Sequence, residues 1–190
     1  YKAASAVVTA RALQQETGVR CVPVFWLQTE DHDLEEIDHL EVRLADGSLQ
    51  RITLKSAHTP RASVSSVRLG EGVEAALREL ADSLGDAPHA DEVLALFRKH
   101  YRRDATWVDA FAGVLSELLP ELVLLDPRDE ALAAQVKGVH ARAFSECDAI
   151  ARALLERQRA LESSGFDVQV HVREASPLSF VHPDGRDGPR

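Results

Sequence analysis

The sequence predicts a fold of the α/β class. Two short apolar runs, Val22–Leu27 and Leu122–Leu125, each end at acidic residues. Segments in which apolar residues recur at helical spacing lie before the first run and between the two. Apolar strands that alternate with helices are typical of a parallel sheet whose strands are buried on both faces.

The first helix is expected at residues 2–17, packed on this sheet. Its apolar side consists of residues at helical spacing: Ala3, Val7, Ala10 and Leu13. Gly18 then provides the left-handed residue that commonly ends a helix. The strand that follows contains Pro23, which has no N–H to donate to a ladder. This strand is therefore expected at an edge of the sheet, or with its partner bulged or absent at that point.

A small antiparallel β insertion is expected at residues 39–70, after a first part of the core at residues 1–38. Apolar and polar residues alternate along 40–44 and again along 52–54. Asp46-Gly47 between these stretches is a strong hairpin signal. Val67 and Leu69 are expected to add a third strand to the insertion.

Residues 71–128 are expected to contain three helices and the second core strand. The helix at 71–84 has a clear apolar stripe: Val73, Leu77, Leu80 and Leu84. A second helix is expected at about 91–101. The third starts at Thr106, whose hydroxyl can cap it, and Asp109 suits the positive first turn.

Residues 129–165 are expected to form one long coiled-coil helix. Their apolar residues follow a heptad pattern with a local stutter. At about 1.5 Å per residue this helix would be on the order of 50 Å long, so it is expected to project from so small a core and to serve in dimerisation. Residues 166–190 are expected to form a β hairpin and a polar end, because Val168, Val170 and Val172 alternate with polar residues.

Composition excludes several classes of function. The 22 basic and 31 acidic residues give a net charge of −9, and the basic residues are scattered, so a nucleic-acid-binding face is not expected. No run approaches the roughly 18 apolar residues needed to span a membrane. The two cysteines, Cys21 and Cys147, form no framework and are expected to be reduced, which indicates a cytoplasmic protein.

The candidate active site lies where the first strand ends. Four ionisable residues follow its apolar run: Glu30, Asp31, His32 and Asp33. Ligands of open α/β sheets bind beyond the carboxyl ends of the strands, and Asp126 occupies the equivalent place after the second strand. We therefore expect these carboxylates to share one hollow with Asp126.

Two other interpretations of the same residues remain open. One is a metal-dependent hydrolase, although neighbours on an extended segment cannot all face one ion, so ligands such as His39 and Asp126 would be needed. The other is a non-catalytic dimerisation module built on the long helix. Outside any family context, four ionisable residues after a strand are more often a solvated loop than a catalytic cluster.

Several blocks, taken in order, carry a family resemblance. They are Tyr1-Lys2-Ala3, Val22-Pro23-Val24-Phe25-Trp26, Glu30-Asp31-His32-Asp33 with Glu36 and His39, Leu124-Leu125-Asp126-Pro127, and Gln169-Val170. Together they resemble the bacillithiol biosynthesis cysteine-adding enzymes, a family of cysteine ligases, over nearly the whole chain. The block from Val22 to Asp33 is the specific part of the match.

The resemblance implies a Rossmann-like core with insertions, a projecting coiled coil and a homodimer. It also implies the last step of bacillithiol formation, in which cysteine is joined to glucosaminyl-malate, with ATP or ADP and Mg²⁺ as cofactors. The family's glycine-rich segment lies just before the Tyr-Lys pair. We therefore expect the first strand, a phosphate-binding loop and the carboxyl-terminal half to lie outside this chain, and this chain alone to be inactive.

Amide formation needs an activated carboxylate, a neutral amine and a stabilised oxyanion. Glu30, Asp31 and Asp33 are candidates to hold an ammonium group or Mg²⁺. His32 is a candidate to take the proton that the amine loses, since an unperturbed imidazole titrates near neutral pH. Three further residues are expected to bind substrate, Lys2 through a phosphate: Lys2, His39 and Asp126.

Overall fold

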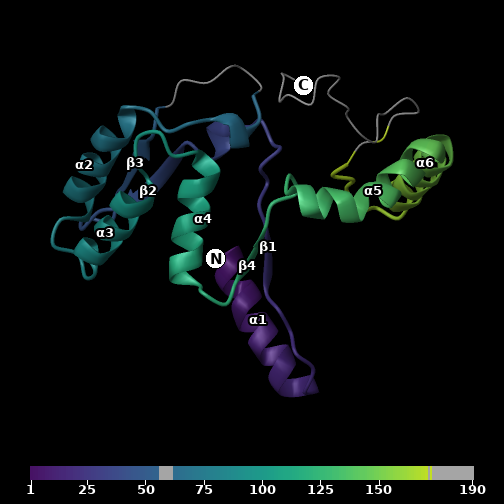
Figure 1. The fold of residues 1–190 in the computed structure, drawn as a ribbon, viewed down its shortest axis with the longest axis horizontal. Coiled ribbons are helices and arrows are strands. Elements are labelled where there is room, and N and C mark those ends of the chain that lie inside the picture. Colours follow the sequence, from purple (N-terminus) through teal and green to yellow (C-terminus); the bar gives the residue numbers. More distant parts are fainter. Residues whose placement is uncertain (56–61, 171, 173–190) are drawn as a thin grey trace. The chain divides into compact units, whose positions relative to one another are not determined.

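The computed structural model describes residues 1–55, 62–170 and 172. The described residues form two compact units, residues 1–128 and residues 129–172 (Figure 1). Both cysteines are free thiols, as expected. Within the described residues, no helix is both long and apolar enough to cross a membrane.

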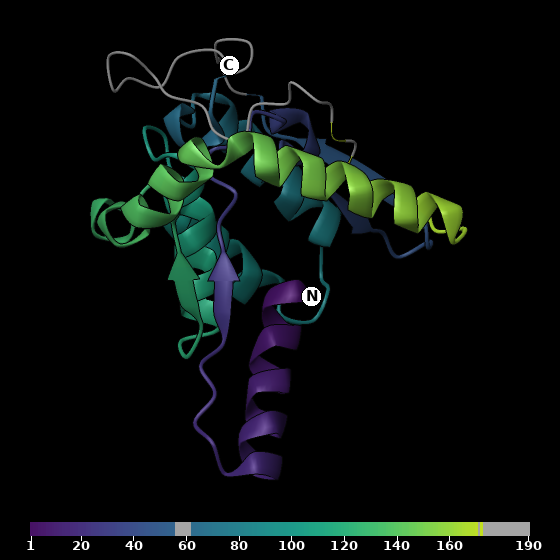
Figure 2. The ribbon, with the colours of Figure 1, turned by 90° about the vertical axis from the view of Figure 1, so that its right-hand side faces the viewer.

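The first unit contains the predicted parallel strands. Helix α1 (Lys2–Thr17) ends at Gly18, which has a φ of 70°, and is followed by β1 (Val24–Trp26). β1 pairs in parallel with β4 (Val123–Leu125), and Phe25 lies opposite Leu124. Figure 2 shows the two arrows side by side, pointing the same way, with α1 next to them. The α/β prediction is confirmed for this pair.

Pro23 is accommodated because only its carbonyl takes part in pairing. Its oxygen accepts a hydrogen bond of 2.9 Å from the backbone N–H of Val123, and its nitrogen needs no partner. Among the described strands, β1 has β4 as its one neighbour and is therefore at an edge, as Pro23 predicted.

The prediction that these strands are buried on both faces is wrong. Phe25 is half-buried and packs with α1 and α4 (Trp107–Leu118), whereas Val24 and Trp26 are 49% and 56% exposed. The reason is that helices cover one face of β1 among the described elements. Leu13, expected on the buried side of α1, is also exposed, because the carboxyl half of that helix extends past the strands (Figure 2).

The hairpin forms where the alternation predicted it. β2 (His39–Arg43) pairs antiparallel with β3 (Leu49–Thr53), and Gly47 in the turn has a φ of 86°. The hairpin packs against α2 (Gly72–Leu84) and α3 (Ala90–His100) (Figure 1). Three buried residues join them: Ile52, Leu80 and Leu94.

The third strand expected at Val67 and Leu69 does not join the hairpin. A 3₁₀ turn, η2 (Val64–Ser66), precedes these residues, and Arg68 makes a single bridge to Thr106. Val67 and Leu69 are instead buried in the main core, since the backbone of Leu69 bonds to Asp104 and Ala105 just before α4. Val67 and Leu69 alternate with polar residues because they are buried against the loop before α4, and not because they pair with another strand.

The three expected helices of this unit are present. Val73, Leu77 and Leu80 are buried along α2, as their spacing predicted. Thr106 caps α4, because its hydroxyl accepts a hydrogen bond of 3.0 Å from the N–H of Asp109.

The second unit contains two helices where one was expected. α5 (Glu130–Ser145) and α6 (Cys147–Ser163) are separated at Glu146, whose φ of −110° and ψ of 16° leave the helical region. The hydroxyl of Ser145 bonds back to the carbonyl of Arg142, which competes with helix continuation, and Asp148 favours a new helix start. The single long helix is therefore a wrong prediction, and a coiled coil between chains stays a prediction.

The strand expected near residue 168 is not formed in the part of the chain that the structure describes. Residues 166–170 have no regular secondary structure, and the N–H of Val172 bonds to the side chain of Gln158 in α6. An alternating sequence needs a partner strand to form a ladder, and none lies beside these residues within the described ranges. The hairpin expected farther on lies outside the described residues.

Candidate active site

A partly buried side-chain hydrogen bond ties the loop after β1 to the end of β4. The hydroxyl of Thr29, which is 2% exposed, donates to Oδ1 of Asp126 over 2.7 Å. The same carboxylate oxygen accepts the backbone N–H of Arg128 over 2.9 Å. Asp126 therefore holds together the chain segments that leave the two parallel strands.

A second set of bonds fixes this loop from the side of η2. The carbonyl of Thr29 accepts hydrogen bonds from the hydroxyl of Ser63, at 2.7 Å, and from the N–H of Ser65, at 3.1 Å. The N–H of Val64 donates to the carbonyl of Asp31 over 2.7 Å. Segments that are 34 residues apart in sequence thus position the loop from Thr29 to Asp31.

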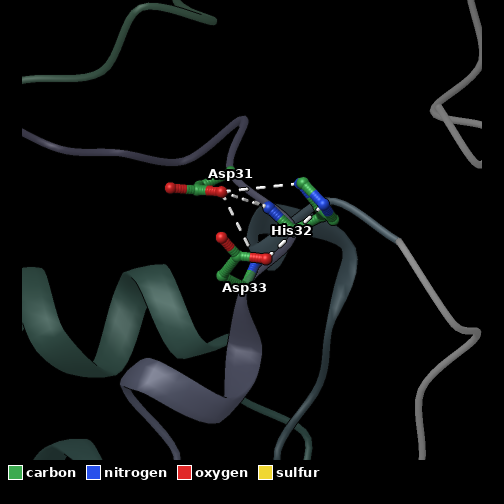
Figure 3. A group of neighbouring side chains, drawn as sticks. All are labelled: Asp31, His32 and Asp33. Atoms are coloured by element: carbon green, nitrogen blue, oxygen red, sulfur yellow. Dashed lines mark hydrogen bonds and ion pairs between the residues drawn. The ribbon is translucent and has the colours of Figure 1, made fainter. Parts of the chain in front are cut away.

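Three of the four predicted catalytic residues come together in this loop (Figure 3). His32 lies between two carboxylates: its Nδ1 is 3.6 Å from Asp31 Oδ1 and its Nε2 is 3.5 Å from Asp33 Oδ1. Oδ1 of Asp31 also accepts the backbone N–H of His32 at 2.7 Å. The side chains are partly open to solvent, so they are accessible to a ligand.

The expectation that Asp31, His32 and Asp33 cannot all face one ion is wrong. One ligand atom from each of Asp31, His32 and Asp33 lies within 4.8 Å of the others, although the residues are adjacent. The segment is folded into turns rather than extended, since the N–H of Asp31 donates to the carbonyl of Gln28 and the N–H of Leu34 to the carbonyl of His32. Neither His39 nor Asp126 is needed to assemble the group.

The remaining predicted residues are distributed differently from the expected common hollow. Glu30 is exposed and is not part of the three-residue group. Asp126 accepts the hydrogen bond from Thr29 and is not one of the three clustered ligand groups, so its expected contact with substrate stays a prediction. Lys2 and His39 line a separate cavity beside β1.

His39 is held between a carboxylate and a guanidinium. Its Nδ1 lies 2.9 Å from Asp38 Oδ1 and also 2.9 Å from Arg51 Nη2. Nδ1 donates to Asp38 when it carries a proton and accepts from Arg51 when it does not, so one tautomer satisfies only one partner at a time. This side chain therefore already has partners on the hairpin.

The cavity lies within residues 1–128 and measures about 660 Å³. Sequence reasoning missed it, because its wall residues have the spacing of ordinary core positions. Its wall is mostly apolar and combines β1, α4 and α1 residues with residues of the hairpin, α2 and α3. Six aromatic side chains contribute: Phe25, Trp26, Phe97, Tyr101, Trp107 and Phe111.

Two buried polar groups stand out among these aromatic residues. Burial raises the pKa of Tyr101 to about 12, so its hydroxyl stays neutral at physiological pH. The indole Nε1 of Trp107 is buried without a hydrogen-bond partner in the described part of the chain. The sequence also did not predict that Thr29 and Ser63 position the loop after β1. A single hydroxyl residue in a loop forms no recognisable sequence pattern.

The comparisons with known proteins agree on one family. The family model described as "Bacillithiol biosynthesis BshC, N-terminal Rossmann-like domain" matches residues 1–186. Three similar relatives share the name "Putative cysteine ligase BshC". The protein of Koribacter versatilis (strain Ellin345) is 38% identical over 186 residues, which are 97% of this chain and 34% of the relative.

The relative from Chlorobaculum tepidum is 32% identical, covering 91% of this chain and 31% of its own length. The relative from Solibacter usitatus (strain Ellin6076) is 30% identical, and the match covers 98% of this chain and 35% of the relative. The chain therefore spans about a third of the length of the curated relatives it matches. The parallel pair β1 and β4, with helices between them, fits the Rossmann-like description. The chain belongs to the BshC family of bacillithiol biosynthesis and corresponds to its N-terminal Rossmann-like domain.

Proposed function

We propose that this chain is part of a ligase that joins cysteine to glucosaminyl-malate in the last step of bacillithiol biosynthesis. The observation that carries the proposal is family membership over 97% of the chain, with relatives named as cysteine ligases. The geometry is consistent with it, because ionisable side chains gather at the carboxyl end of β1, where α/β sheets place their ligands.

The group at Asp31, His32 and Asp33 suits the proton transfer that amide formation requires. The attacking amine must be neutral and must lose a second proton after attack on the activated carboxyl carbon of cysteine. We assign the proton acceptor to His32, which lies between the carboxylates of Asp31 and Asp33.

The cofactor proposed for this reaction is ATP, with ADP as its product, and Mg²⁺. Two carboxylates close together are hard oxygen donors of the kind that Mg²⁺ accepts alongside phosphate oxygens. Asp31 and Asp33 fit this requirement, since their oxygens lie within the same 4.8 Å group. Lys2, in the first turn of α1, is the candidate phosphate contact. The nucleotide would supply the leaving group on the cysteine carboxylate.

We further propose that the active protein is a cytoplasmic homodimer that associates through α5 and α6. These helices expose several large apolar side chains: Val139, Phe144 and Leu154. Such side chains are more stable when covered by a partner. We keep Glu30 as a candidate catalytic residue, and His39 and Asp126 as candidate substrate contacts, outside the three-residue group.

The test is bacillithiol formation by the complete gene product from cysteine, glucosaminyl-malate and ATP with Mg²⁺. His32→Ala and Asp31→Asn are expected to reduce turnover by about 100-fold or more, the usual scale for a general base. Glu35→Gln, at an exposed neighbour outside the group, is the matched control. Residues 1–190 alone are expected to be inactive. Unchanged turnover in both site variants would remove this group from the mechanism.

A further inference from the structure

We infer that the 660 Å³ cavity in residues 1–128 is a binding site for an amphipathic aromatic anion. By this we mean a molecule with a planar apolar body and one anionic group. The inference rests on the cavity itself and does not depend on the proposed ligation. Cysteine and glucosaminyl-malate are small polar molecules, so they would leave an apolar wall without matching contacts.

The size and lining of the cavity favour a ring system. Ligand sites typically occupy about 300–1,000 Å³ and are mainly apolar with a few polar groups, which describes this cavity. The aromatic side chains in its wall also support one another. Phe25 lies 6.2 Å from Phe111, and Tyr101 lies 5.3 Å from Phe97 and 6.2 Å from Trp107, measured between ring centroids. Aromatic walls that are held in place offer edges and faces for a planar ligand.

The polar groups at the cavity favour an anion over a cation. Lys2 lines the cavity and forms no ion pair with any residue in the described ranges. It lies in the first turn of α1, where the helix dipole is positive. Asp38, the carboxylate of the lining, lies 2.9 Å from Nδ1 of His39, which donates to it when that nitrogen carries the proton. Tyr101 also lines the cavity, and its phenol, neutral at physiological pH, is a hydrogen-bond donor.

Two fluorescent probes that differ by one charge test this inference on the complete gene product. 1-Anilinonaphthalene-8-sulfonate is an aromatic anion, and N-phenyl-1-naphthylamine is its uncharged analogue. Trp26 and Trp107 are the two tryptophans of the chain and both line the cavity. We expect saturable binding of one sulfonate probe per chain, with enhanced probe fluorescence and quenching of the tryptophan emission.

Variants that fill the cavity identify the place of binding. Ala76→Trp adds a large side chain to the wall from α2, whereas Ala75→Trp adds the same side chain at an exposed position of that helix. Ala76→Trp is expected to weaken binding of both probes by about tenfold or more, equivalent to about 1.4 kcal/mol, and Ala75→Trp to leave it unchanged. If Ala76→Trp does not fold, Val108→Trp is used instead, because it fills the cavity from α4 and is expected to weaken binding of both probes in the same way.

A charge variant tests the preference for an anion. Lys2→Gln is expected to weaken the sulfonate probe several-fold and to leave the uncharged probe unaffected, with Lys55→Gln, outside the lining, as the control. Equal binding to the wild type and to both cavity-filling variants would overturn the site. Equal loss of both probes in Lys2→Gln would overturn the anionic specificity. Bacillithiol formation is assayed separately, and because Lys2 is also the candidate phosphate contact, the cavity is judged from probe binding alone.

Discussion

The hydroxyl of Thr29 donates a hydrogen bond of 2.7 Å to Oδ1 of Asp126, although the two residues are 97 positions apart. This bond joins the segments that leave β1 and β4 directly beyond the parallel pair. Because Thr29 precedes the group at Asp31, His32 and Asp33 by only two residues, the bond also sets where that group is presented. Asp126 thus helps to fix the loop that carries the candidate site.

Removing the hydroxyl of Thr29 is expected to destabilise the first unit. Thr29→Val keeps the shape of the side chain but breaks the bond to Asp126, and hydrogen bonds to charged groups contribute about 1.5–3 kcal/mol. Thr29→Ser keeps a hydroxyl and is expected to retain most of this stability. Urea unfolding of both variants provides the measurement. Equal midpoints for Thr29→Val and the wild type would show that the bond contributes nothing.

Gly113 is expected to be intolerant of a side chain because the ring of His100 occupies the space. A Cβ added at Gly113 would clash with the ring of His100, at Nδ1 first. Overpacking of this kind costs about 1–3 kcal/mol, so Gly113→Ala should lower the unfolding midpoint. Adding His100→Ala in the same chain should restore part of the loss. Thermal and urea unfolding of the single and double variants measure this coupling.

Gly138 is the matched control for that substitution. It also lies within a helix, α5, but an added Cβ there would meet nothing within 4 Å. Gly138→Ala is expected to favour the helix by about 0.5–1 kcal/mol. Helicity is measured by circular dichroism. A loss of helicity in Gly138→Ala would show that an added Cβ does not fit at this position.

Burial of Tyr101 predicts a loss of stability at alkaline pH. Burial raises its folded pKa to about 12, above the ordinary value of 10.0, so the folded state favours the neutral phenol. The contribution is fully present below pH 10 and is lost as the pH rises from 10 to 12. Two pKa units correspond to about 2–3 kcal/mol. Tyr101→Phe should remove this part of the alkaline slope in urea unfolding between pH 9 and 12, and an unchanged slope would contradict it.

The lowered pKa of Glu117 predicts that the protein loses stability at acid pH. Hydrogen bonds from Lys99, at 2.7 Å, and His100, at 2.8 Å, lower the pKa of Glu117 below its ordinary value of 4.5. The stability from this lowered pKa is present above pH 4.5 and is lost as the pH falls through the folded pKa. The unfolding midpoints of Glu117→Gln and the wild type should therefore converge on acidification. Glu74→Gln, at an exposed position of α2, should show no such convergence.

The sequence by itself determined the local elements of this protein. Helical spacing predicted α1, α2, α3 and α4, and the glycine after α1 and the hydroxyl of Thr106 marked helix ends as expected. Asp46-Gly47 predicted the hairpin turn. These features could be predicted because spacing, capping and turn chemistry act between residues that are close in the chain.

Only the tertiary structure decided which faces are buried and which side chains meet. Val24 and Trp26 are apolar but exposed, because burial depends on what covers a strand and not on its own composition. The break at Glu146 arises from a few hydrogen bonds that a heptad pattern does not encode. The cavity between α4 and the hairpin combines residues from distant segments. Contacts of this kind depend on the path of the whole chain, so no local pattern in the sequence predicts them.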